Sequence, residues 1–139
     1  MILVTGAIGN LGSSVINQLD KVVNKDQFIA TSSSDKGVQN LKEKGYQARK
    51  ANFNDMDTLR DAFNGVEKVL LISTMEQNRF EQHKNVIDIA KEKGVKHIAY
   101  TSLSIKDIET SAVKELMMSH FETEAYLKQS GLTYTILRN

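Results

Sequence analysis

Short apolar runs alternate along the chain with longer segments in which apolar residues recur at helical spacing. Such runs have the length expected of strands, and several are continuously apolar, as parallel strands buried on both faces are. The alternation therefore predicts repeated strand–helix units around one parallel sheet. The six expected strands are Ile2–Thr5, Phe28–Ser32, Tyr46–Ala51, Val69–Ser73, His97–Ser102 and Thr133–Leu137.

The segments between these runs predict helices that each have one apolar face. The stripes are Leu11, Val15, Ile16 and Leu19 in a helix over about residues 10–19, and Phe80, His83, Val86, Ile87 and Ala90 in a later helix. Glycine follows a polar residue where helices should end, as left-handed caps require. These glycines are Gly45, Gly65, Gly94 and Gly131.

The order of strands in the sheet can be predicted from the chirality of their connections. Crossovers between parallel strands are right-handed, which favours a doubly wound α/β sheet in the order 3-2-1-4-5-6 with helices on both faces. Ligands of such sheets bind beyond the carboxyl ends of the strands, near the point where the order reverses. We therefore expect a binding site between the ends of the first and fourth strands.

Composition narrows the classes of partner. The 139 residues fit a single domain, and 18 basic against 17 acidic side chains indicate neither a nucleic-acid partner nor an anionic membrane surface. No apolar run approaches the ~20 residues that span a bilayer, and no secretory signal is recognised at the N-terminus. With no cysteine, disulfides and thiolate sites are excluded, and a reducing cytoplasmic location is expected. The histidines have no metal-ligand spacing, so no metal is expected.

A glycine-rich loop joins the first strand to the first helix, with the sequence Gly6-Ala7-Ile8-Gly9-Asn10-Leu11-Gly12. In a dinucleotide fingerprint, the first glycine permits a tight turn, the second lets the backbone approach the pyrophosphate, and the third lets the helix pack on the strand. The helix N-terminus attracts the anion without a lysine. An ordinary strand-to-helix turn is the alternative, but the context of strand, loop, helix and second strand favours a Rossmann-type site. Its expected contacts are Gly6, Ile8, Gly9, Asn10, Leu11 and Gly12.

Residues after the second strand bear on the choice between NADP and NAD. An acidic residue there accepts the ribose 2′-hydroxyl of NAD and repels the 2′-phosphate of NADP. Here Ser32, Ser33 and Lys36 could hold a phosphate, and Asp35 is better placed to cap the next helix. NADP is therefore favoured, although Asp35 could also turn toward a ribose, which keeps NAD open.

Six segments together give the chain a family resemblance. The chain resembles the NmrA-like, atypical branch of the short-chain dehydrogenase/reductases, and within it the bacterial NAD(P)H:quinone oxidoreductases. The resemblance implies a reductase that takes hydride from NADPH and delivers it to a quinone. Two positions depart from common family patterns: Ile8 replaces a threonine, and Ser32 stands where firm NADP binders often have arginine. The six segments are residues 4–12, 69–73, 82–88, 94–103, 120–124 and 134–139.

Relatives in this family continue well past the segment that ends here at Asn139. The resemblance therefore implies that residues 1–139 form the NAD(P)-binding domain and that the substrate-binding segment is largely missing. A quinone is the expected acceptor, and a homo-oligomer or a partner is expected over the truncated edge. The alternative is a non-catalytic NAD(P)-sensing module of the NmrA-like regulator type. A methyltransferase would share the sheet, but its site requires an acidic residue after the second strand.

Candidate contacts near the nicotinamide lie at the ends of the fourth and fifth strands. They are Ser73, Thr74, Thr101 and Ser102. His120 stands where other members of the superfamily place a lysine, so it is a further candidate, the alternative being a surface or half-buried residue. No catalytic residue is predicted, because hydride transfer depends chiefly on stacking the acceptor against nicotinamide.

Four other chemistry-bearing residues have structural interpretations. Tyr46 and Lys50 have the spacing of a catalytic tyrosine–lysine pair, but they belong to the third expected strand, remote from the switch point. Tyr100 is expected to end the fifth strand with its side chain turned away from that of Ser102, and is interpreted as a core residue at least as readily as a functional one. His83 shares a helix face with Phe80 and Ile87, which favours a core histidine.

Overall fold

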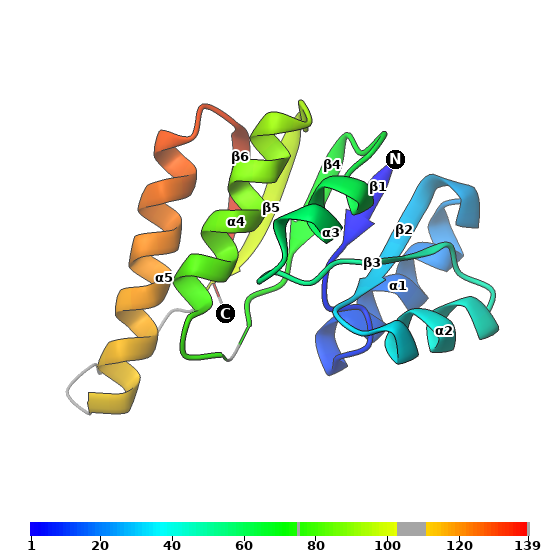
Figure 1. Ribbon diagram of the computed structural model, residues 1–139, viewed down its shortest axis with the longest axis horizontal. Coiled ribbons are helices and arrows are strands. Elements are labelled where there is room, and N and C mark those ends of the chain that lie inside the picture. The colour runs from blue at the N-terminus through cyan, green and yellow to red at the C-terminus, as the bar shows by residue number, and fades with distance from the viewer. Residues whose placement is uncertain (75, 103–110, 139) are drawn as a thin grey trace.

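A parallel six-stranded sheet forms the centre of the protein, in the order β3-β2-β1-β4-β5-β6. The computed structural model describes residues 1–74, 76–102 and 111–138 (Figure 1). The predicted fold class and strand order are confirmed, and the order reverses between β1 and β4. The strands are β1 (Ile2–Val4), β2 (Phe28–Ser32), β3 (Ala48–Lys50), β4 (Lys68–Leu71), β5 (His97–Ser102) and β6 (Thr133–Arg138).

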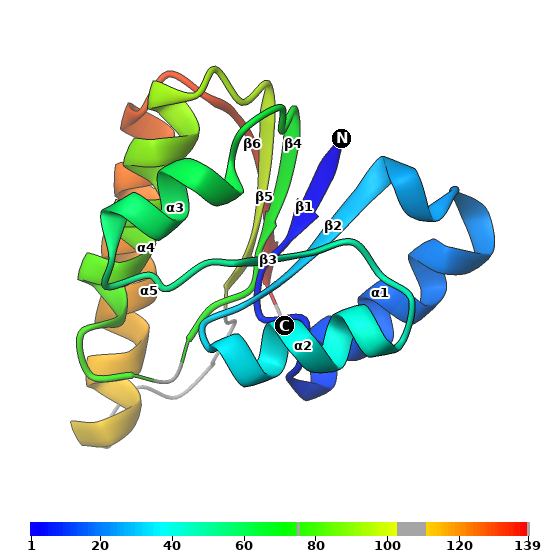
Figure 2. The same ribbon diagram turned by 45° about the vertical axis from the view of Figure 1, so that its right-hand side comes forward.

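Helices cover both faces of this sheet, as Figure 2 shows most clearly. On one face lie α1 (Asn10–Val22) and α2 (Asp35–Glu43). On the other lie α3 (Met56–Ala62), α4 (Arg79–Glu92) and α5 (Ser111–Gln129), and a short 3₁₀ helix, η1 (Lys25–Gln27), precedes β2. Within the described part of the chain, no helix is both long and apolar enough to cross a membrane.

Two apolar cores form because successive strand residues point to opposite faces. Leu3 and Ile29 enter the larger core beneath α3, α4 and α5, whereas Val4, Phe28 and Ala30 enter the smaller one beneath α1 and α2. Continuous burial of β2 follows from this double coverage. The continuously apolar runs therefore mark the strands that both helix layers cover.

Several predicted boundaries and one predicted stripe need correction. Tyr46 lies outside β3, in the turn after α2, where its ring packs 5.9 Å from that of Phe28. The fourth strand ends at Leu71 rather than Ser73. Leu11 was expected to pack on the sheet but is 46% exposed, because it lies in the first turn of α1, beyond the end of β1. The four glycines expected at helix ends all adopt positive φ, which confirms those turns.

Candidate functional site

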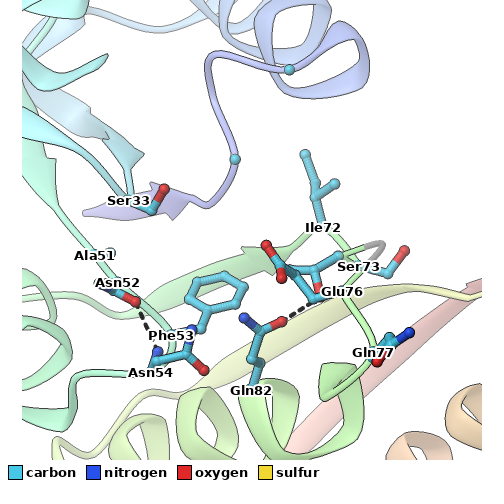
Figure 3. Close-up of a pocket in the computed structure, with 13 residues that line it drawn as sticks. Ser33, Ala51, Asn52, Phe53, Asn54, Ile72, Ser73, Glu76, Gln77 and Gln82 are labelled. Atoms are coloured by element: carbon cyan, nitrogen blue, oxygen red, sulfur yellow. Dashed lines mark hydrogen bonds between the residues drawn. The ribbon is translucent and has the colours of Figure 1, made fainter. Parts of the chain in front are cut away.

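A cleft of about 800 Å³ opens at the carboxyl ends of β1, β2, β3 and β4, beside the point between β1 and β4 where the strand order reverses. In Figure 3, Ser33 and the segment Asn52–Asn54 lie on one side, and Ile72 and Ser73 lie on the other. Its volume falls in the range of small-molecule and cofactor sites, roughly 300–1,000 Å³. The lining residues are Gly6, Gly9, Ser33, Ala51, Asn52, Phe53, Asn54, Ile72, Ser73, Thr74, Glu76, Gln77 and Gln82.

The glycine loop forms one wall of this cleft. Gly6 has a φ of +60°, a left-handed conformation that residues with a Cβ rarely adopt. Gly12 touches the loop so closely that an added Cβ would stand 2.0 Å from the Gly6 carbonyl oxygen. These two glycines therefore let α1 begin directly behind the end of β1.

The N-terminus of α1 has the properties of an anion site. Gly9 is its N-cap residue and supplies no side-chain hydrogen bond, and the first turn carries no acidic residue. The first amides of a helix lack partners inside the helix and carry positive partial charge. Asn10, Leu11 and Ile8 are exposed around them. Their contacts with a cofactor remain predictions.

The segment between β2 and α2 separates the three residues expected to hold a 2′-phosphate. Ser33 is exposed and lines the cleft, and Lys36 is exposed on the first turn of α2. Ser32 is only 8% exposed, and its Oγ accepts a hydrogen bond from the Ser34 amide at 3.4 Å. An added Cβ at Gly37 would lie 2.0 Å from this Oγ, so the Ser32 hydroxyl is tucked beneath α2.

The expected cap of α2 is wrong by one residue. Ser34, with an extended backbone, is the N-cap, and its Oγ accepts a hydrogen bond from the Gly37 amide at 3.0 Å. Asp35 is already the first helical residue, so its side chain cannot take that role, and it pairs with Lys50 at 3.4 Å. Lys50 thus has a structural contact, as expected from its position in the third strand.

The opposite wall is the segment Ile72–Thr74, which follows β4. Side chains accept hydrogen bonds from its backbone amides. The Ile72 amide donates to Thr5 Oγ1 at 2.8 Å, and the Ser73 amide donates to Thr101 Oγ1 at 2.9 Å. The Thr74 amide donates to Nε2 of His83 at 3.1 Å. Ser73 and Thr74 face the cleft, whereas Thr101 is buried behind them, 5% exposed.

A buried polar cluster lies behind this wall, between α4, β5 and α5. The Tyr100 hydroxyl lies in hydrogen-bond contact with Nδ1 of His120, and Nδ1 of His83 lies 3.1 Å from Thr123 Oγ1. Burial lowers the pKa of His83 to about 3, with smaller contributions from His120 and Arg79, and burial also lowers the pKa of His120. Both rings are therefore neutral at ordinary pH.

Two expectations about this cluster are corrected. The fifth strand spans His97–Ser102, as predicted, but Tyr100 was expected to point away from Ser102, whereas residues two apart share a face of a strand. Both side chains accordingly contact α5. His120 is 1% exposed rather than half-buried. The core interpretations of Tyr100 and His83, which are fully buried, are confirmed.

Ser102 contacts a separate ion pair at the ends of β5 and β6, in which Glu124 is buried and Arg138 is exposed. Its Oγ donates to Glu124 at 2.6 Å, and Arg138 Nη2 donates to the same carboxylate at 2.7 Å. Burial acts to raise the pKa of Glu124, but the hydrogen bonds from Arg138 and Ser102 outweigh it and leave that pKa lowered. Ser102 thus joins a charged cluster with Glu124 that sequence reasoning did not anticipate.

Sequence reasoning also missed the segment after β3. Asn85 Nδ2 donates to the Phe53 carbonyl and Asn78 Nδ2 to Asn54 Oδ1, both at 2.8 Å, so α4 and its leading loop hold this segment against the cleft. Its position beyond the carboxyl end of the third expected strand was a usable signal, because all such ends meet at one edge of the sheet. Gln82 was missed for another reason: it lies on α4 and reaches the cleft only through packing.

Comparisons with known proteins agree with this geometry. The chain is 44% identical, over its whole length, to quinone oxidoreductase 2 of Escherichia coli, of which it covers 48%. It is 33% identical over 98% of its length to an NmrA-like family domain-containing oxidoreductase of Aspergillus flavus, of which it covers 46%. The chain thus spans about half the length of the curated relatives it matches.

A solved structure extends the comparison to three dimensions. The crystal structure of an NADPH-dependent quinone oxidoreductase from Escherichia coli, complexed with NADPH, superposes with a TM-score of 0.87 at 45% identity. The match covers 100% of this chain and 48% of that one. A family model described as NAD(P)H-binding matches residues 6–139, from the first glycine of the loop onward. The chain therefore belongs to the NAD(P)H-binding family, in agreement with the resemblance that its loop and strand segments indicated.

Proposed function

We propose that residues 1–139 form the cofactor-binding domain of an NADPH-dependent reductase that passes hydride to a quinone. The observation that carries this proposal is the cleft itself, which places the uncapped N-terminus of α1 opposite the Ser73–Thr74 wall. The NADPH complex of the related quinone oxidoreductase supports it. The chain spans about half the length of its relatives. Oxidation of NADPH by this chain alone is therefore also a proposal.

The residues present fit a phosphorylated dinucleotide. The amides at the start of α1 would hold the diphosphate, since no acidic side chain in that turn opposes an anion. Ser33 and Lys36 would take the 2′-phosphate, and Asn52–Asn54 would border the adenosine. Asp35, the carboxylate beside Lys36 in the sequence, is paired with Lys50, which favours NADP over NAD.

The chain's own contribution to the chemistry is orientation. When bound, NADPH supplies the hydride. Ser73 and Thr74 would set the position of its nicotinamide at the carboxyl end of β4, and the cleft wall would limit the access of water. No acid–base pair on the chain is required for hydride transfer to a quinone, which agrees with the absence of a charged pair among the described residues that line the cleft.

Fluorescence titration with NADPH and NADH, followed by addition of a soluble benzoquinone, tests the proposal directly. We expect saturable binding, tighter for NADPH, and oxidation of NADPH when quinone is added. Binding with no oxidation above the protein-free rate would contradict the reductase activity but not the cofactor site. Failure to bind either nucleotide would contradict both.

The second candidate function is a dinucleotide-binding module without turnover, whose signal passes to a partner or a second copy. Apolar side chains that remain exposed on α5 and β6 favour it, because such residues are used in interfaces. They are Met118, Phe121, Tyr134 and Leu137. Saturable binding without turnover, together with a larger assembly by light scattering when cofactor is added, would select this candidate.

A further inference from the structure

The wall formed by Ile72–Thr74 is held in an unusual way for a segment that continues a strand. In a parallel sheet, backbone carbonyls of the neighbouring strands accept the amides. Here three successive amides donate instead to side chains: Thr5 next to β1, Thr101 on β5 and His83 on α4. All three acceptors are buried. The position of this wall is therefore determined by side chains from three separate elements.

His83 connects this wall to α5. Because Nε2 accepts a hydrogen bond from the Thr74 amide, Nε2 carries no proton. The single proton of the neutral ring therefore lies on Nδ1. Nδ1 then donates to Thr123 Oγ1, and the Thr123 hydroxyl donates to the Ser119 carbonyl at 2.9 Å. One imidazole thus bridges the backbone of the cleft wall and the helix behind it.

Thr74 is held through its side chain as well. Its Oγ1 donates to Gln82 Oε1 at 2.6 Å, and Gln82 is the residue before His83 on α4. Ser73 is held twice in the same manner, because Thr101 Oγ1 accepts its amide and also lies 3.4 Å from its Oγ. The hydroxyls of Ser73 and Thr74 are thereby given defined positions at the edge of the cleft.

We propose that His83 and Thr101 are positioning residues for the cofactor, which act through the amides of Thr74 and Ser73 without contacting the nucleotide. Thr101 thereby receives a role different from the direct contact that its sequence position indicated. This inference rests on the proposed cofactor binding. It predicts that the hydrogen-bond acceptors at these two positions, rather than the size of the side chains, govern affinity for NADPH.

Two substitutions of His83 separate its two hydrogen bonds. His83→Gln places an oxygen near the position of Nε2 and keeps an acceptor for Thr74, whereas His83→Asn reaches only as far as Nδ1. We expect the glutamine variant to bind NADPH within about threefold of the parent, and the asparagine variant to bind about tenfold more weakly, the cost of an unsatisfied buried amide. In ¹⁵N NMR spectra without cofactor, the Thr74 amide proton should shift and exchange faster only in His83→Asn.

The matched pair at Thr101 provides an independent measurement. Thr101→Ser keeps the hydroxyl that accepts the Ser73 amide, whereas Thr101→Val keeps the shape and removes the acceptor. We expect affinity to be retained by serine and to fall about tenfold with valine. If circular dichroism shows that His83→Asn does not fold, the Thr101 pair alone decides whether the buried acceptors govern NADPH affinity.

The outcomes distinguish this inference from the proposed function. If the parent chain binds NADPH and the asparagine and valine variants bind equally well, the positioning role is wrong and the cofactor site stands. Equal loss in all four variants would also overturn it, because a role in packing alone would not be rescued by glutamine or serine. If the parent binds neither nucleotide, the proposed function fails first, and the role in affinity falls with it.

Discussion

The two walls of the cleft are built on different principles. The wall around Gly6, Gly9 and Gly12 offers backbone amides and depends on the absence of side chains. The opposite wall, Ile72–Thr74, is held by buried side chains of Thr5, Thr101 and His83. A backbone wall suits an anion of fixed shape, because its donors are aligned by the helix. In a wall held by side chains, substitution of one residue changes the hydrogen bond of one amide and leaves the others in place.

The difference also decides which wall can be recognised in a sequence. Glycines at fixed spacing report a local backbone requirement. Hydrogen bonds of the second wall join residues as far apart as Thr5 and Ile72, 67 positions along the chain. No short motif records such a pair.

The largest expected effect is that of Gly12→Ala on the first wall. The added Cβ would lie 2.0 Å from the Gly6 carbonyl oxygen and close to Ala7, so α1 must move away from β1. Overpacking of this kind costs about 3 kcal/mol. Urea denaturation should show the loss in the free energy of unfolding without cofactor. A loss smaller than that of an alanine at an exposed helix position, Asn17→Ala, would contradict the assigned close approach.

The second effect is a pH dependence that belongs to the other wall. The folded-state pKa of His83 is lowered from 6.5 to about 3. Between pH 6.5 and pH 3, His83 is therefore protonated in the unfolded chain but stays neutral in the folded chain. Stability is then fully present above pH 6.5 and falls as pH decreases toward 3. Between pH 6.5 and pH 5 the loss for one such group is about 2 kcal/mol.

His120, whose pKa is lowered in the same direction, adds to this loss, while Arg79 and Glu124 are the charged groups that influence the cluster. His83→Gln should therefore flatten the dependence of unfolding free energy on pH between 6.5 and 5, relative to the parent. His97→Gln, on the exposed side of β5, is the matched control. Identical slopes for the parent and His83→Gln would disprove the buried neutral state of His83.

A third effect separates binding from stability within the first wall. At Gly9 an added Cβ meets no atom closer than 3.5 Å, and φ is −69°, so Gly9→Ala should fold normally. Its methyl group would nevertheless stand where the backbone must approach the pyrophosphate. We expect NADPH affinity to fall about tenfold, equivalent to about 1.4 kcal/mol. Calorimetric titration measures it, and undiminished binding would place the diphosphate elsewhere.

The smallest expected effect concerns the choice of nucleotide. Removal of the exposed ammonium in Lys36→Ala should weaken NADPH about fivefold and leave NADH unchanged, since exposed charge pairs contribute about 1 kcal/mol or less. Lys42→Ala, exposed in the last turn of the same helix, is the control. Loss of affinity for both nucleotides alike, or from the control, would remove Lys36 from the 2′-phosphate site.

What the sequence by itself determined was the architecture: six strands, their order, the glycine loop and the edge of the sheet where the cleft opens. These follow from periodicity, right-handed crossovers and backbone geometry, which are local properties or nearly so. Four left-handed turns were predicted for the same reason, since a positive φ there requires glycine.

Only the tertiary structure decided which polar side chains face the cleft. Ser32 and Ser33 are neighbours of the same type, yet the first is buried beneath α2 at Gly37 and the second is exposed. His120 lies buried at Tyr100 because α5 packs on β5, a contact between residues 20 positions apart. Burial and hydrogen-bond partners of this kind depend on the packing of whole elements, so they were settled by the fold and not by residue type.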